Sequence, residues 1–172
     1  MLAPGSPLPP LACPACLPDG RIEPVELAAY RGRWLVLLFW PYDFARQAAA
    51  ELRDYAELAG DFELSGAALL GASVDSAYAH QAWTRLGLGA ARFPLLGDSR
   101  RELATACGVL GADGVAVSAC YIATPEGRIA GVSACDPVAR RSARDTLRQL
   151  HALQSGELAA SAWTPTSIDL AA

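Results

Sequence analysis

Two cysteines, Cys13 and Cys16, stand in the sequence Cys-Pro-Ala-Cys, a spacing typical of dithiol redox centres and of half zinc sites. A redox pair of this kind begins a helix, because the amino end of a helix favours the thiolate. These two cysteines instead lie in a proline-rich stretch, and no second pair of ligands with zinc spacing follows. We therefore expect two thiols without a chemical role and no metal site, and keep a redox pair at Cys13 and Cys16 as the alternative.

The three remaining cysteines occur singly. Cys107 falls at the end of a predicted helix, where the dipole opposes a thiolate, and Cys135 falls in the loop after a predicted hairpin. Cys120 lies on an apolar strand, two residues from Ser118 and on the same face of that strand. Buried cysteine usually packs as a small hydrophobic residue, so we expect structural thiols, with Cys120 as a candidate relocated nucleophile.

The composition indicates a globular, mildly acidic protein. A chain of 172 residues with 52% hydrophobic and 19% charged residues is not a disordered one. The net charge is −4 and all fourteen basic residues are arginine, so we expect no nucleic-acid partner. No apolar run approaches the length of a membrane span, and no basic head opens the chain. These features predict a cytoplasmic protein with no membrane partner.

Strand and helix patterns alternate along the chain and predict one domain over residues 1–172, with an extended N-terminal arm at 1–18 and a C-terminal tail at 154–172. Apolar runs predict the strands, and 3.6-residue periodicity with capping residues predicts the helices. The expected strands cover residues 35–40, 67–74, 93–96, 115–123 and 128–133, and the expected helices begin near 44, 76, 99 and 138. This order predicts an α/β, thioredoxin-like fold with a central mixed sheet flanked by helices.

The segment over residues 34–51, an apolar strand that runs through a Pro turn into a helix, resembles the peroxide site of the peroxiredoxin family. Members of the alkyl hydroperoxide reductase C, or thiol-specific antioxidant, type carry the pattern Pro-x-x-x-Thr-x-x-Cys there, with the reactive thiolate in the first helical turn. Pro41 and Glu51 match this pattern, but Ala45 stands at the Thr position and Ala48 at the Cys position. An alanine methyl has no lone pair with which to attack a peroxide.

Two further positions of the family pattern also differ. Ser118 aligns with an arginine that hydrogen-bonds the reacting oxygens, and Ala159 aligns with the cysteine that resolves the oxidised nucleophile. Arg141 matches a second arginine near the family's site, which implies residual anion affinity beneath Ala48. An engineered Cys-to-Ala change would explain one or two of these differences but not four, so we interpret the loss as native. The emptied pocket is expected to be lined by Pro41, Ala45, Ala48 and either Trp40 or Trp83.

The resemblance, with these losses, predicts a degenerate peroxiredoxin-like protein without standard thiol peroxidase activity. It would act as a binding, scaffold or chaperone-like subunit in redox homeostasis, without a cofactor. The alternative is a thiol-dependent peroxidase or oxidoreductase that uses Cys13 and Cys16, or Cys120. The expected partner is a second copy in a homodimer or higher ring that pairs through the strand near residues 128–133, or an active peroxiredoxin in a hetero-oligomer.

Overall fold

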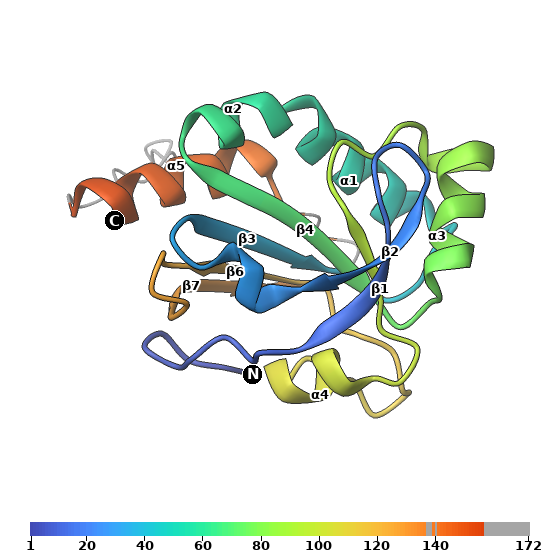
Figure 1. Ribbon diagram of the computed structural model, residues 1–172, viewed down its shortest axis with the longest axis horizontal. Helices are drawn as coiled ribbons and strands as arrows, with labels where there is room; N and C mark the ends of the chain where they lie inside the picture. The colour runs from blue at the N-terminus through green and yellow to red at the C-terminus, as the bar shows by residue number, and fades with distance from the viewer. Residues whose placement is uncertain (137–138, 140, 157–172) are drawn as a thin grey trace, which may run out of the picture.

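One mixed β-sheet organises the chain in the computed structural model, which describes residues 1–136, 139 and 141–156 (Figure 1). Its strands lie in the order β2-β1-β5-β4-β3-β6-β7. The strands are β1 (Ala12–Cys16), β2 (Ile22–Glu26), β3 (Trp34–Phe39), β4 (Ala67–Ser73), β5 (Leu95–Gly97), β6 (Ala119–Ala123) and β7 (Ile129–Ala134). The helices are α1 (Arg46–Glu57), α2 (Ala59–Leu64), α3 (Ala77–Trp83), α4 (Glu102–Cys107) and α5 (Ala143–Ser155), with a 3-10 turn at Leu27–Tyr30 and a π turn at Thr84–Leu88.

The centre of the sheet is formed by β3 and β4, which pair in parallel and are buried along almost their whole length. Continuous apolar sequence is expected for strands covered on both faces, and β3 reads Trp-Leu-Val-Leu-Leu-Phe. β6 pairs antiparallel with the other side of β3, and β7 follows it as the edge strand. β3 therefore carries the chain from the middle of the sheet directly to the amino end of α1.

Helices cover both faces of the sheet. One face of the sheet carries an apolar cluster that includes Leu52 of α1, Phe62 of α2, Trp83 of α3 and Leu150 of α5. The apolar cluster on the other face includes Leu103 of α4. Figure 1 shows the same division, with α4 alone below the sheet. Successive residues of β3 alternate between the two clusters, as the period of a strand requires.

Three local predictions were wrong. No strand was expected within residues 1–18, but these residues contain β1, which lies between β2 and β5 and pairs antiparallel with both. The last helix begins at residue 143 and not near 138, because the Ser142 hydroxyl accepts the Asp145 amide and caps it there. α4 begins at Glu102 and not near 99, and the Asp98 carboxylate caps it from outside the helix.

Asp98 is buried, and its carboxylate accepts the amides of Leu103 at 3.1 Å and Ala104 at 2.7 Å. Burial raises the pKa of Asp98 above its usual range, while these amide bonds oppose the shift. We expect Asp98→Ala to lower the free energy of unfolding by about 1–3 kcal/mol, because two buried amides lose their acceptor. Urea denaturation measures this. Asp98→Asn keeps an oxygen acceptor and should lose less; equal losses in both variants would contradict the capping role.

Candidate functional site

A cavity of about 330 Å³ lies where β3 ends and α1 begins. It brings together all five described residues that the sequence analysis assigned to the degenerate peroxide site, namely Pro41, Ala45, Ala48, Glu51 and Ser118. The cavity is also lined by Trp40, Tyr42, Gln47, Leu52 and Asp136. Of these five, the sequence analysis predicted only Trp40. The resolving position, Ala159, lies outside the described residues.

The amino end of α1 presents hydrogen-bond donors without acceptors. Its N-cap residue is Ala45, which has no side-chain oxygen, and no acidic residue occurs in the first turn. The first helical bond runs from the Ala49 amide to the Ala45 carbonyl at 2.9 Å. The amides of residues 46–48 precede that bond, and no acceptor for them occurs in the described part of the chain. The helix dipole therefore makes this end of the cavity electropositive.

Ser118 contributes a hydroxyl from the opposite side, on the segment that leads into β6. Ser118 is 3% exposed, and its hydroxyl is not among the buried side-chain atoms of the described residues that lack a hydrogen-bond partner. Ala48 is 7% exposed and contributes a methyl group. None of the lining residues is a cysteine. The cavity thus has a donor-rich, electropositive end and no thiol among these residues.

A buried ion pair joins Glu51 to Arg141 across 90 positions of sequence. The Glu51 carboxylate accepts three hydrogen bonds from Arg141. The donors are Nε–H at 2.9 Å, Nη2–H and the backbone amide at 3.3 Å. Arg141 Nη2 also donates to the Phe39 carbonyl at 3.0 Å, whereas its buried Nη1 has no partner among the described residues. Burial opposes the charge on Arg141, but the Glu51 carboxylate outweighs it and raises the pKa of Arg141.

A second buried pair fixes the loop between β3 and α1, and the sequence analysis did not predict it. Nδ1 of His80 lies 2.7 Å from the Asp43 carboxylate, and Nε2 donates to the Leu96 carbonyl at 3.0 Å because that oxygen can only accept. Asp43 also accepts the Trp40 indole N–H at 3.0 Å and donates its own amide to Asp75. The two pairing residues are 37 positions apart, so no local pattern signals the contact.

Trp40 lines the cavity, and the alternative, Trp83, does not. The Trp83 ring lies 6.1 Å from the Trp40 ring and 6.1 Å from the Phe44 ring, behind the cavity wall. Phe44 has φ +60°, a left-handed conformation that is uncommon for an aromatic residue, and its side chain is 57% exposed. The contact with Trp83 therefore accompanies a strained turn into α1.

Cys13 and Cys16 lie on opposite faces of β1. Their separation of three residues along a strand points their side chains in opposite directions, and they belong to different apolar clusters. Both side chains are buried. Burial, with the Asp98 charge, raises the pKa of Cys13 to about 11, and burial also raises the pKa of Cys16. A dithiol centre on these two cysteines is therefore disfavoured by geometry as well as by ionisation.

Cys120 lies on the same sheet face as the cavity but deeper in the core. It neighbours the hydrogen-bonded side chains of Tyr55 and Thr146, whose oxygens are 2.7 Å apart. Burial raises the pKa of Cys120 to about 11 and that of Cys107 to about 12. Cys135, by contrast, is half-buried, and its amide donates to the Ser118 carbonyl at 3.1 Å beside the cavity. The sequence analysis placed Cys135 in a loop and missed this proximity.

The buried thiols predict a loss of stability at alkaline pH. Cys13, Cys107 and Cys120 keep their protons in the folded state up to about pH 11–12, whereas an unfolded cysteine ionises near pH 9. Unfolding then releases protons, so the free energy of unfolding should fall as pH rises above 9, by up to about 1.4 kcal/mol per pH unit per thiol. Urea denaturation between pH 8 and 10 measures the slope. Cys120→Ala should make it shallower and Cys135→Ser should not; identical slopes in all three proteins would contradict the assignment.

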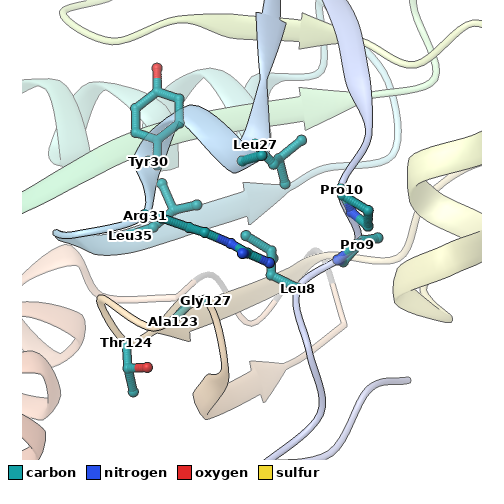
Figure 2. A pocket seen from close by; sticks show the side chains of 11 residues that line it. Leu8, Pro9, Pro10, Leu27, Tyr30, Arg31, Leu35, Ala123, Thr124 and Gly127 are labelled. Carbon is teal, nitrogen blue, oxygen red and sulfur yellow. The ribbon is translucent and has the colours of Figure 1, made fainter.

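A second pocket, shown in Figure 2, lies between the N-terminal segment and the turn at Leu27–Tyr30. The Arg31 side chain reaches across it toward Leu8 (Figure 2). Its free volume of about 10 Å³ holds roughly one water molecule. No group of three or more metal-binding side chains occurs among the described residues. In that same part of the chain, no helix has the length and apolar character needed to cross a bilayer.

Comparisons with known proteins agree with the fold. The AhpC/TSA family profile matches residues 5–132. Alkyl hydroperoxide reductase C of Mycolicibacterium smegmatis is 39% identical over 148 residues, which cover 85% of this chain and 76% of that protein. Peroxiredoxin-1 of Gallus gallus is 34% identical over 173 residues, 95% of this chain and 87% of the relative.

Solved structures give the same result. Mycobacterium tuberculosis AhpC superimposes with a TM-score of 0.87 at 35% identity, covering 95% of this chain and 99% of that one. The reduced 2-Cys peroxiredoxin of Plasmodium vivax superimposes with a TM-score of 0.89 at 25% identity, covering 98% and 92%. The predicted thioredoxin-like peroxiredoxin fold is therefore confirmed. The chain belongs to the AhpC/TSA family.

Proposed function

We propose that this chain is a family member that has lost peroxide reduction at the usual site and acts as a binding or scaffold subunit in redox homeostasis. The observation that carries the proposal is the composition of the cavity, in which Ala48 occupies the first turn of α1 and no lining residue bears a thiol. A helix amino end can activate a thiolate only if the thiol is there. The fold, by itself, does not require retained activity.

The alternative proposal is a peroxidase or oxidoreductase that uses relocated cysteines, and the family's usual activity favours it. The burial and raised pKa values of Cys13, Cys16 and Cys120 speak against it, because the thiolate is the reactive form. Cys135 is half-buried whereas the other four cysteines are buried, and its amide donates to the carbonyl of Ser118, a residue that lines the cavity. Cys135 is therefore the first cysteine to substitute in a test of this alternative.

Stopped-flow addition of hydrogen peroxide and of an alkyl hydroperoxide, followed by mass spectrometry of each thiol, separates the two proposals. The binding-subunit proposal expects consumption at the rate of a free thiol, linear in peroxide and unchanged by any single Cys→Ser substitution. A rapid, saturable reaction that disappears in Cys135→Ser, in Cys120→Ser or in the Cys13→Ser/Cys16→Ser double variant would establish the enzyme instead.

For partners, we propose a homodimer or higher ring, or a hetero-oligomer with an active peroxiredoxin, in the cytoplasm. The backbone edge of β7 beyond Ile129 supports this, because an edge strand has unpaired N–H and C=O groups. Ile129 itself exchanges backbone hydrogen bonds with Gly5 and Ser6, so the start of the strand is covered by the N-terminal segment. Val132, on that strand, is 37% exposed. Sedimentation of the chain alone and mixed with an active relative distinguishes the homo-oligomer from the hetero-oligomer.

A further inference from the structure

A groove, here called the α5 groove, runs along α5 on the side that faces α1 and α2 (Figure 1). It consists of two adjoining hollows of about 240 and 490 Å³, which have Leu58 and Arg144 in common. Glu57 lies opposite Arg144 in the smaller hollow. Beyond the end of α2, the Ser65 hydroxyl lies 2.8 Å from Nε2 of His151. The two walls of the groove therefore run in the same direction along the chain.

The walls of the α5 groove carry opposite charges. The wall from α1 and α2 is acidic and contains Asp54, Glu57 and Asp61, whereas the wall from α5 is basic and contains Arg144 and Arg148. Within the residues that the structure describes, the side chains of Glu57, Asp61 and Arg144 have no hydrogen bond and no ion pair. These three charges are therefore not paired within one copy of the chain.

An exposed leucine stands at the end of the acidic wall. Leu64 is the last residue of α2, three positions after Asp61, and it is 90% exposed. The larger hollow beside it contains two partly buried leucines, Leu58 and Leu147. An apolar knob close to an apolar hollow on the same face suits a contact between two copies, in which each leucine covers the hollow of the other copy.

The positions of the charges select one symmetric arrangement of two copies. A two-fold axis along the α5 groove lays the acidic wall of each copy on the basic wall of the other, whereas an axis across the groove lays like charges on each other. Glu57 and Arg144 lie at the same level of the groove. The first arrangement therefore pairs Glu57 with Arg144 of the second copy, twice, and brings Leu64 to the hollow beside His151.

We infer that the α5 groove is a contact surface for a second copy of this chain, which docks face to face with Leu64 in the apolar hollow and Glu57 against Arg144. This surface shares no residue with the cavity or with β7, so it goes beyond the proposed function and does not depend on whether the chain reduces peroxide. Exposed ion pairs and one apolar contact form a small interface, and we expect a Kd on the order of 10–100 μM.

Sedimentation equilibrium of the full chain at concentrations of about 5–300 μM tests the inference. Leu64→Glu should weaken the association at least about tenfold, because it places a charge against the apolar hollow. Leu86→Glu makes the same change at another leucine, which is 80% exposed and lies outside the α5 groove, and should leave the association unchanged. Added salt should weaken the association, since the charges of the groove are exposed.

Charge reversal at Glu57 and Arg144 gives the sharpest comparison. Glu57→Arg alone and Arg144→Glu alone should each associate at least about tenfold more weakly, because the two-fold axis then brings like charges together in both contacts. An equal mixture of the two variants should recover the association, since each copy then meets a copy of opposite charge. A purely structural effect of either substitution does not predict recovery in the mixture.

Val132→Glu distinguishes this contact from the proposed contact through β7. We expect an association that is lost in Leu64→Glu and kept in Val132→Glu, which changes the edge strand. An association kept in Leu64→Glu and lost in Val132→Glu would support the β7 contact and overturn the inference. Monomers at every concentration, which would leave the α5 groove to a different partner, or no recovery in the mixture of charge variants would also overturn it.

Discussion

Replacing Ala48 by cysteine is expected to give this chain a peroxide-reactive thiol. The second-order rate with hydrogen peroxide should rise at least about 100-fold above that of the unmodified chain, because the new thiol lies at the electropositive end of α1 inside the cavity. Its pKa should fall below about 7.5, the range of cysteines at helix amino ends. Stopped-flow kinetics measure the rate, and thiolate absorbance against pH measures the pKa.

The matched control is Glu57→Cys, which places an exposed thiol at the carboxyl end of the same helix. There the dipole disfavours the thiolate, so no increase is expected. Adding Ala45→Thr and Ser118→Arg to Ala48→Cys introduces the other two groups that the family resemblance implies beside the cavity. These additions should increase the rate about 10²–10³-fold further, the effect typical of a positioned donor. An Ala48→Cys variant no faster than the Glu57→Cys control would show that the site has lost more than its thiol.

Glu51→Gln is expected to be the most destabilising single change near the cavity. It leaves the Arg141 guanidinium buried without its carboxylate, which typically costs about 3–5 kcal/mol of the free energy of unfolding. The loss in Glu51→Gln/Arg141→Met should be smaller than the sum of the two single losses, because the double variant buries no unpaired charge. Urea denaturation at neutral pH measures all three.

The control for this pair is Asp145→Asn, which removes the exposed ion pair between Asp145 and Arg148 at 3.5 Å. The side chains there are 52% and 37% exposed, so the expected loss is below about 1 kcal/mol. Additive losses at Glu51 and Arg141, or a loss at Glu51 no larger than that at Asp145, would mean that water reaches the pair and screens it.

The sequence predicted the central elements well, because their signals are local. Residues 35–40 and 67–74 were expected as strands and form β3 and β4 with boundaries shifted by about one residue. β1 was missed, since its five residues include a proline and have no clear periodicity, and its strand conformation depends on pairing with β2 and β5. The start of α5 was misplaced because apolar periodicity alone does not reveal which residue caps the helix.

The cavity was predicted through the family pattern, which supplied Pro41, Ala45, Ala48, Glu51 and Ser118 together. The partners of those residues could not be predicted. Glu51 meets Arg141 and Asp43 meets His80 only after the chain has folded, at separations of 90 and 37 positions. The spacing of residues along the chain does not predict contacts between segments this far apart, because it reports only on neighbours within one helix or strand.

The sequence by itself determined which atoms are available: an alanine in the first turn of α1, a serine at residue 118 and five thiols elsewhere. Only the tertiary structure decided what those thiols can do. It placed Cys13 and Cys16 on opposite faces of a strand and covered Cys120 with Tyr55 and Thr146. The physical reason is that the reactivity of a thiol depends on its hydration and on nearby charges, and segments far apart in the chain provide both.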